Sequence, residues 1–237
     1  MEKLIRRRGW MAGFAGQLGV KEVTEMDKLL FLSILFSCLL TAVRVIHTGR
    51  ATFLFLIWNI FLACIPYFIT SGLVRRPEWV KRKKIFVPIF LIWLLFVPNS
   101  FYIITDLYHL GDHYNDRQVP QWFDLAMILS YVWNGLLLGV LSVRQMEKMV
   151  LPRMSFREEL LFLYPVMWLN ALGVYTGRYL RYNSWDVLTD PFQLLADIAG
   201  MIIHPLRHQY AWDMILCFSI LMTLIYLMLK RISKALT

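Results

Sequence analysis

Charged side chains are scarce in this sequence, and the stretches without them are long. Asp, Glu, Lys and Arg make up 17% of the 237 residues, and hydrophobic residues make up 58%; a soluble domain averages about 25% charged and about 45–50% apolar residues. Apolar runs of about 20 residues, enough helix to cross the roughly 30 Å hydrocarbon core of a bilayer, occur at Leu29–Ile46, Thr52–Thr70 and Ala211–Leu229. The composition therefore excludes an ordinary soluble domain and predicts a polytopic α-helical membrane protein.

Cysteine is rare, and the common catalytic motifs are missing. Cys38, Cys64 and Cys217 all fall in apolar runs, so we expect free buried thiols and neither a disulfide framework nor a cysteine zinc site. No glycine-rich phosphate loop, GxSxG elbow or nucleotide-binding signature occurs. The N-terminus has basic residues but lacks the apolar core and cleavage site of a signal peptide. No activity can therefore be assigned from a motif.

Six apolar segments predict an all-α bundle of six transmembrane helices within residues 29–229. A short interfacial or re-entrant helix is expected in the last outer loop. The predicted spans are Leu29–Ile46, Thr52–Thr70, Ile85–Ile104, Trp122–Val143, Leu160–Leu180 and Ala211–Leu229.

The basic residues predict the orientation of these spans. Most of the 25 Lys and Arg residues lie in residues 1–28, in the second and fourth connections, and in the tail 230–237. Lys and Arg are retained on the cytoplasmic side, so we expect both termini there. Topology also explains the net charge of +9, and no nucleic-acid partner is expected. Residues 1–28 fit an interfacial helix or a disordered tail.

Polar residues gather at the outer end of the third span. Asn99, Tyr102, Asp106 and His109 are spaced three, four and three residues apart, which places them in one stripe along a helix. Pro98 should kink the helix or restart it and free a backbone carbonyl. The stripe is expected at the outer membrane boundary.

The outer end of the fifth span carries a second polar group. Arg178 is expected at the same depth as Asp106. The group consists of Arg178, Arg181, Asn183 and Asp186. Asp190 followed by Pro191 is a favourable helix start, and a helix from there to about Ile203 would be too short to cross the membrane.

Small and amide side chains within the spans predict how the helices pack. Gly135 with Gly139, and Gly173 with Gly177, have the small-xxx-small spacing that allows close helix contact in lipid. Three asparagines deeper in the spans are expected to form hydrogen bonds between helices. They are Asn59, Asn134 and Asn170.

Two stretches resemble the signatures of a known family. They are FVPNSFYIITDLYHL at Phe96–Leu110 and GRYLRYNSWD at Gly177–Asp186. In this order they are similar to those of the bacterial integral-membrane family labelled domain of unknown function 1361 (DUF1361), and the resemblance covers most of the chain after about Lys28. The resemblance implies a bacterial multi-pass membrane protein, which we expect in the plasma membrane. The family has no assigned activity, so no catalytic residue is carried over.

The outer polar residues have two interpretations. In the first, Asp106 and Arg178 form an ion pair that only fixes two helix ends. In the second, the residues line an outward-facing pocket, because ionisable groups in an apolar protein tend to mark functional sites. Its lining would be Asn99, Tyr102, Asp106, His109, Arg178, Arg181, Asn183 and Asp186. The arginines would contact an anion, with Asp106 and His109 as candidate base and acid.

A metal site is a narrower alternative. Asp106 and His109 have i, i+3 spacing, His204 and His208 have i, i+4 spacing, and Asp112 and His113 are close in sequence. Two histidines and a carboxylate suit a catalytic zinc ion, but no HExxH pattern is present. We therefore expect no cofactor and leave a divalent metal open.

Two classes of function remain. The first is a membrane-embedded enzyme or binding protein for a lipid-linked or anionic headgroup. The second is a transporter, or a non-catalytic accessory subunit of an envelope assembly, in which the outer cluster is purely structural. A transporter should show midplane charges or broken helices in paired halves, and only Pro98 and the short loop helix resemble that. The sequence therefore favours the first class, with the bilayer and a lipid or anionic small molecule as partners.

Overall fold

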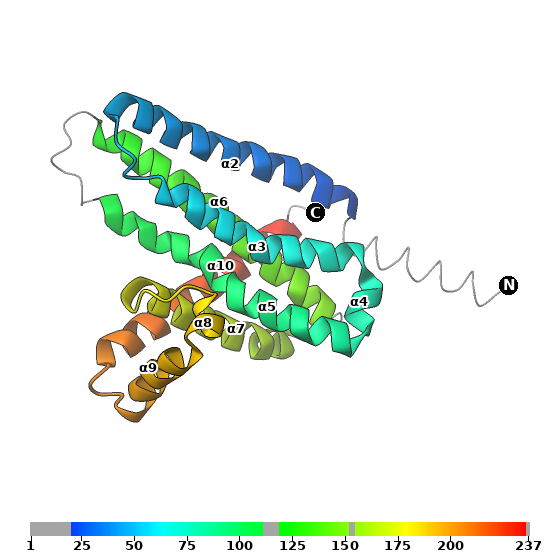
Figure 1. The fold of residues 1–237 in the computed structure, drawn as a ribbon. Coiled ribbons are helices and arrows are strands. Elements are labelled where there is room, and N and C mark those ends of the chain that lie inside the picture. Colours follow the sequence, from blue (N-terminus) through cyan, green and yellow to red (C-terminus); the bar gives the residue numbers. More distant parts are fainter. Residues whose placement is uncertain (1–19, 111–118, 152–154, 236–237) are drawn as a thin grey trace.

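The computed structural model describes residues 20–110, 119–151 and 155–235, and these residues form helices and loops without a strand. Figure 1 shows a bundle of antiparallel helices. The elements are α2 (Val20–Thr48), α3 (Phe55–Arg75), α4 (Pro77–Lys81), α5 (Lys83–Tyr102), the 3₁₀ helix η1 (Ile103–Leu110), α6 (Gln121–Val150), α7 (Phe156–Tyr179), α8 (Asp186–Thr189), α9 (Pro191–Ile203) and α10 (Gln209–Ala235).

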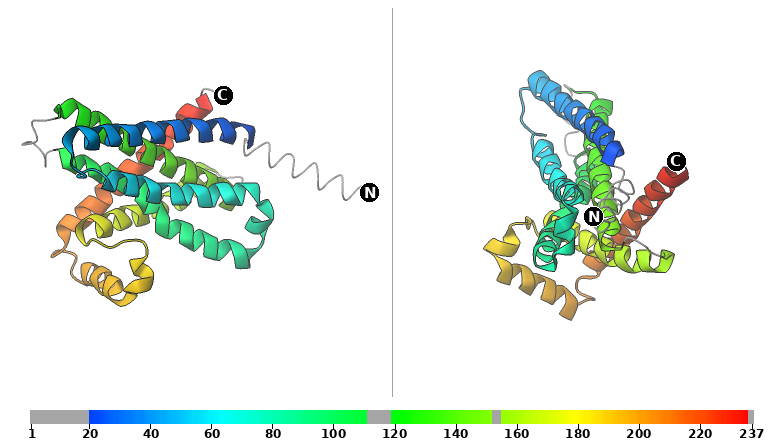
Figure 2. Two further views of the ribbon diagram at one scale, coloured as in Figure 1. Left: turned by 45° about the horizontal axis from the view of Figure 1, so that its top comes forward. Right: turned by 90° about the vertical axis from the view of Figure 1, so that its right-hand side faces the viewer.

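Six of these elements are long and apolar enough to cross a membrane: α2, α3, α5 together with η1, α6, α7 and α10. The chain is therefore a multi-pass membrane protein, and the predicted number of spans is confirmed. The short connection α4 marks one end of the bundle, and α9 marks the opposite end (Figures 1 and 2). We refer to these as the α4 end and the α9 end.

Several helices extend beyond the predicted spans. α2 already begins at Val20, within the segment expected before the membrane, and α6 continues to Val150. α10 runs to Ala235, so it includes most of the expected tail. Lys230, expected in that tail, is instead buried between Glu147 and Glu159. Buried partners on two neighbouring helices explain why the helix continues through this charge.

The third span changes its helical form near the α9 end. Pro98 lies inside α5 without ending it, and the change to a 3₁₀ helix comes at Ile103. Because a 3₁₀ helix has three residues per turn, Asp106 and His109 share a face with Ile103. Tyr102 and the residues before it follow the α-helical period instead. The predicted single polar stripe is thus divided into two groups.

The half of α5 nearer the α9 end is held between two pairs of glycines. A Cβ atom added to Gly135 would lie 2.8 Å from the carbonyl oxygen of Ser100, and one added to Gly173 would lie 2.7 Å from the ring of Pro98. Such distances are shorter than atoms tolerate, so both positions require glycine for this helix spacing. The predicted close packing is confirmed for Gly135, Gly139 and Gly173, while Gly177 has a looser contact.

Amide and thiol side chains in the spans agree only partly with expectation. Asn134 donates a hydrogen bond to Ser37 of α2 at 3.0 Å, as predicted for an interhelical contact. Asn170 instead reaches Met167 of its own helix, at 3.9 Å, and its buried side-chain oxygen has no hydrogen-bond partner among the described residues. The three cysteines are free, as expected, but none is fully buried: Cys38 and Cys64 are half-buried and Cys217 is exposed.

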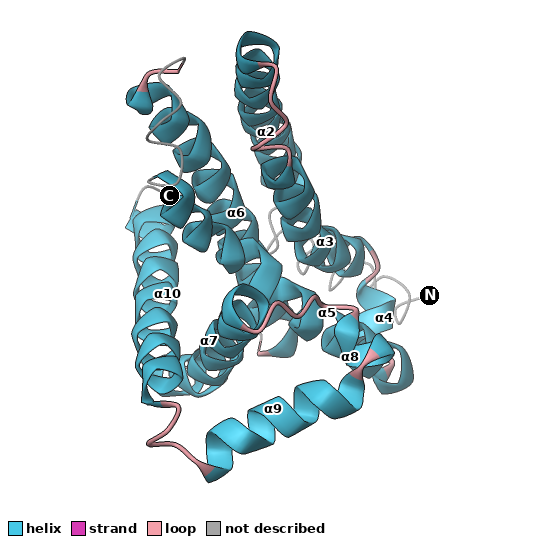
Figure 3. Ribbon diagram, turned by 60° about the vertical axis from the view of Figure 1, so that its left-hand side comes forward, coloured by secondary structure: helices cyan, strands magenta, loops and turns pink. Residues whose placement is uncertain are grey.

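α9 lies across the end of the bundle rather than within it. Figure 3 shows it between α8 and the start of α10, beside the ends of the long helices. It begins at Pro191 after Asp190, as predicted, although Asp190 makes no capping hydrogen bond through its side chain. Phe192 and Leu195 are exposed while Met201 is buried. This pattern suits a helix with one face on the bundle and one on lipid.

Candidate functional site

Asp106 and Arg178 meet at the α9 end, as the sequence predicts. The Asp106 carboxyl group is fully buried, and its Oδ1 lies 3.9 Å from Nη1 of Arg178. The same Nη1 lies 3.2 Å from Nε2 of His109. A guanidinium group has only donors, so Nε2 of His109 must accept this hydrogen bond. The three residues form one group, which joins η1 to α7.

A fourth side chain connects this group to α3. Nδ2 of Asn59 donates to Oδ2 of Asp106 at 2.9 Å. Asn59 was expected to bond between helices, and it does. It is also a cavity residue, which its sequence position did not indicate.

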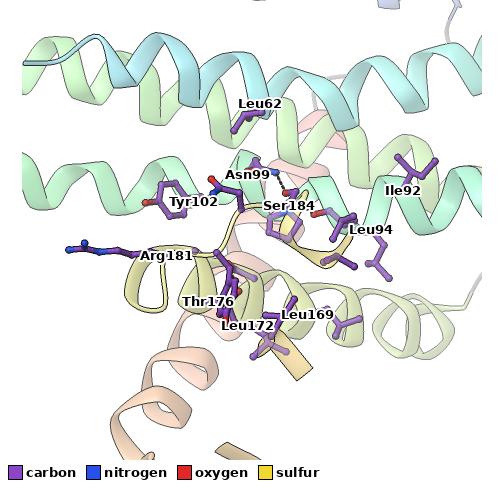
Figure 4. A pocket seen from close by; sticks show the side chains of 18 of the residues that line it. Leu62, Ile92, Leu94, Asn99, Tyr102, Leu169, Leu172, Thr176, Arg181 and Ser184 are labelled. Carbon is purple, nitrogen blue, oxygen red and sulfur yellow. Dashed lines mark hydrogen bonds between the residues drawn. The ribbon is translucent and has the colours of Figure 1, made fainter. Parts of the chain in front are cut away.

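The cavity next to this group has a volume of about 770 Å³. Its walls come from α3, α5 and α7, and it is covered by the loop after α7 together with α8 and α9. In Figure 4 the side chains of Tyr102 and Arg181 extend toward one end of it, whereas Ile92 and Leu94 lie at the other. The cavity is therefore polar toward the α9 end and apolar toward the middle of the bundle.

The apolar part of the cavity reaches the surface of the bundle that faces lipid. Leu91 is 57% exposed and Ile92 is 50% exposed, and both line the cavity. Trp58 of α3, at 52% exposure, lines it from the other side. Since these residues lie within membrane-crossing helices, this part of the cavity borders the hydrocarbon region of the bilayer.

The loop that covers the cavity begins with an unusual backbone conformation. The N–H groups of Leu180 and Tyr182 both donate to the carbonyl of Thr176, at 3.1 and 3.2 Å. Between them Arg181 has a φ of 62°, in the left-handed region where a residue with a Cβ costs about 1–2 kcal/mol. Strain of this kind is concentrated at functional sites. The left-handed conformation places Arg181 at the cavity mouth. Among the described lining residues, Arg181 has the only charged side chain.

Hydrogen bonds fasten the loop to α5. Nδ2 of Asn99 donates to Oγ of Ser184 at 2.8 Å, and that hydroxyl donates to the carbonyl of Leu95 at 3.3 Å (Figure 4). The rings of Trp185 and Trp58 approach to 6.4 Å. The loop therefore has a defined position over the cavity.

Two carboxylates complete the loop. Oδ2 of Asp186 accepts from the backbone N–H of Asn183 at 2.6 Å and from its Nδ2 at 3.3 Å. Asp197 of α9 accepts from the Tyr182 hydroxyl at 2.7 Å. This hydrogen bond, together with desolvation and nearby negative charge, raises the pKa of Tyr182 to about 12. The phenol is thus neutral and serves as a donor.

The structure separates the predicted site residues into three roles. Asn99, Tyr102, Arg181 and Asn183 line the cavity. The ion-pair group of Asp106, His109 and Arg178 lies behind the wall, and Asp186 supports the covering loop. None of these four residues lines the cavity: Asp106, His109, Arg178 and Asp186.

The speculative metal ligands do not come together. Within residues 20–110, 119–151 and 155–235, no group of three or more His, Cys, Asp or Glu side chains is placed to hold an ion. His204 and His208 belong to the connection between α9 and α10. Asp112 and His113 lie outside the described residues.

Comparison with known proteins gives a family but no activity. The family described as protein of unknown function DUF1361 matches residues 58–225, well over half of the chain. No curated protein and no solved structure matches the chain significantly.

Proposed function

The chain belongs to the DUF1361 family, and from its geometry we propose that it binds one amphiphile with a lipid-linked or otherwise anionic headgroup inside the membrane. The observation that carries this proposal is the division of the cavity into a polar end at Arg181 and an apolar end at Leu94. The volume of about 770 Å³ is within the range of about 300–1,000 Å³ typical of small-molecule sites.

The charge distribution favours an anion at the cavity mouth. Arg181 is exposed there, and a guanidinium group forms charge-assisted hydrogen bonds with phosphate or carboxylate. Arg178, by contrast, is engaged by Asp106 and His109. We therefore assign the anion contact to Arg181 alone.

Binding is better supported than catalysis by Asp106 and His109. A general base must come within about 3 Å of the proton it removes, but neither residue is on the cavity wall. We propose that Asp106 positions Asn59 and that Arg178 and His109 hold Asp106. The ion-pair group is then a support for the site.

We also propose that the α4 end faces the cytoplasm of a bacterial cell. Arg75, Arg76 and the basic stretch 81–84 lie at or next to α4, and such clusters are retained on the cytoplasmic side. The cavity mouth at Arg181 would then open toward the outer leaflet.

The experiment is native mass spectrometry of the protein released from bilayers of equal phosphatidylglycerol and phosphatidylcholine with identical chains. We expect one phosphatidylglycerol to be retained per chain. Arg181→Gln should abolish the preference, whereas Arg207→Gln, also exposed at the α9 end, should keep it. Leu94→Trp should reduce retention of both lipids by filling the cavity. Equal retention of the two lipids by the native protein, or loss of preference in both arginine variants, would overturn the proposal.

A further inference from the structure

Asparagine side chains on the cavity wall donate at least one N–H bond each to the protein. Nδ2 of Asn59 donates to Asp106 at 2.9 Å, and Nδ2 of Asn183 donates to Asp186 at 3.3 Å. Because a carboxylate oxygen accepts hydrogen bonds, these contacts fix which end of each amide carries the nitrogen. The amide oxygens are left as acceptors.

Asn99 is fixed in the same way. Its Nδ2 donates to the carbonyl of Phe96 at 2.9 Å and to Oγ of Ser184 at 2.8 Å, which uses both of its N–H bonds. The Ser184 hydroxyl is itself committed as a donor to the Leu95 carbonyl. Among the described residues, no donor to the side-chain oxygen of Asn59, Asn99 or Asn183 is present.

Two further hydroxyl groups on the wall already donate hydrogen bonds within the protein. Thr176 donates to the carbonyl of Gly173 at 3.1 Å, and Tyr182 donates to Asp197 at 2.7 Å. Donors also remain on the described wall. They are Tyr102 and Arg181, which extend toward the mouth (Figure 4), the indole N–H of Trp58, and the second N–H of Asn59 and of Asn183. The polar wall therefore offers both acceptors and donors to a ligand.

From this distribution we infer that the headgroup is rich in hydroxyl groups, as in a sugar or polyol, with its anionic part at Arg181. The amide oxygens need a ligand that brings donors and the remaining N–H groups need acceptors, since a polar group left unpaired away from water is unfavourable. A hydroxyl group supplies both a donor and an acceptor. An ammonium group would also donate, but no Asp or Glu lines the cavity among the described residues. A buried cation without a partner is costly, so uncharged hydroxyls fit better. The inference rests on the proposed function, because the same cavity holds the same amphiphile.

The test compares dodecyl β-glucoside with its tetra-O-methyl ether, which keeps the ring and chain but has no donor. Binding to the full-length protein in phosphatidylcholine nanodiscs is measured by titration calorimetry. We expect the glucoside to bind at least about tenfold more tightly, the factor that follows from one unpaired polar group. Equal affinities for the two compounds would overturn the inference.

Two variants locate the effect in the cavity. Asn183→Ala removes one acceptor from an exposed loop position whose backbone hydrogen bond to Asp186 persists, so the fold should be retained. It should reduce the preference for the glucoside several-fold, and Asn59→Leu should reduce it further. Gln193→Ala, on α9 but outside the cavity lining, is the control and should leave the preference unchanged. If Asn183→Ala behaves as Gln193→Ala does, the acceptors are not at the headgroup.

Further probes separate this inference from the proposed function. Dodecyl phosphate that binds the native protein but not Arg181→Gln supports the proposed function, even if the methyl ether binds as well as the glucoside and the inference fails. Free glucose binding as tightly as dodecyl glucoside would identify a sugar site without a chain requirement, which contradicts the proposed amphiphile. If none of the probes binds, both are overturned.

Discussion

Asp106 and Asn59 are joined by a hydrogen bond of 2.9 Å, yet only Asn59 lies on the cavity wall. The buried carboxylate therefore reaches the cavity through an amide. Arg178 and His109 stand on its other side. The ion-pair group is therefore linked to the cavity through Asn59, and the Asp106 carboxylate fixes the orientation of the Asn59 amide on the cavity wall.

The first prediction concerns the coupling between Asp106 and Arg178. Asp106→Asn and Arg178→Gln should each lower the unfolding temperature, because each leaves the other charge buried without its partner. The double variant should lose less than the two single losses added together, with a coupling of about 0.5–3 kcal/mol. Thermal unfolding in detergent micelles, followed by circular dichroism, measures all four proteins. Strictly additive losses would show that the two groups do not interact.

The second prediction concerns the glycines beside α5. Gly173→Ala should lower the unfolding temperature, because its new methyl group would meet the Pro98 ring at 2.7 Å. Gly177→Ala should have a smaller effect, since its nearest contact is an edge of the Tyr102 ring at 3.3 Å.

Gly72 of α3 provides the matched control for this series. No atom lies within 4 Å of the position its Cβ would take. Alanine there should raise stability by up to about 1 kcal/mol, because it is the better helix former. If Gly72→Ala and Gly173→Ala change the unfolding temperature alike, close packing is not the reason for glycine at position 173.

The fold could be predicted well from the sequence, because a bilayer allows few alternatives. A long apolar run in a bilayer has no water to hydrogen-bond its backbone, so it must form a helix. The length of the run then gives the length of the transmembrane span. The start of α9 at Pro191 could be predicted from the Asp190–Pro191 dipeptide alone. The change to a 3₁₀ helix at Ile103 could not be predicted, since it depends on how η1 packs against α6.

The site could be predicted only in part. Spacing along each segment predicted that Asp106 lies near Arg178, but it could not show which residues face a cavity lined by five helices and a loop. Arg44 illustrates the limit. The sequence places it near a span end, whereas the structure buries it in an ion pair with Asp124 of α6, with Nε 2.6 Å from Oδ1. Such partners are 80 residues apart in the chain, and no local pattern connects them.

The third prediction concerns orientation. In a variant with its three cysteines replaced by alanine, Lys83→Cys at the α4 end should resist a membrane-impermeant maleimide in intact cells. Trp185→Cys, in the loop over the cavity, should be labelled. Both positions are exposed, so access depends on the side of the membrane. Labelling at position 83 together with protection at position 185 would show that the topology is the reverse of the one we propose.

The fourth prediction concerns Arg181, whose φ of 62° favours glycine. Arg181→Gly should keep or raise the unfolding temperature, by about 1 kcal/mol in stability, while it removes the anion contact. A site that gains stability when its charge is lost is expected where function has selected a strained residue. Arg181→Ala is the comparison, since it loses the same charge but keeps the strain. A lower stability for glycine than for alanine would contradict this explanation of the backbone.

The last prediction concerns the buried ion cluster near the α4 end. Lys230 of α10 lies 2.8 Å from Oε1 of Glu159 and also bonds to Glu147, which accepts from the Tyr226 hydroxyl. All three charged groups are at most 9% exposed. They join α6, α7 and α10, and the lysine is shared by two carboxylates.

Lys230→Met should therefore be strongly destabilising, by about 3–5 kcal/mol, because it leaves Glu147 and Glu159 buried without a cation. For a chain of this size that corresponds to a fall of at least about 6 °C in the unfolding temperature. Lys84→Met, at an exposed position, should have little effect and is the control. Adding Glu147→Gln and Glu159→Gln to Lys230→Met should restore much of the loss, since a buried ion cluster can be replaced by neutral groups at little cost. If Lys230→Met is as stable as Lys84→Met, the two carboxylates do not depend on the lysine, and the cluster does not hold these helices together.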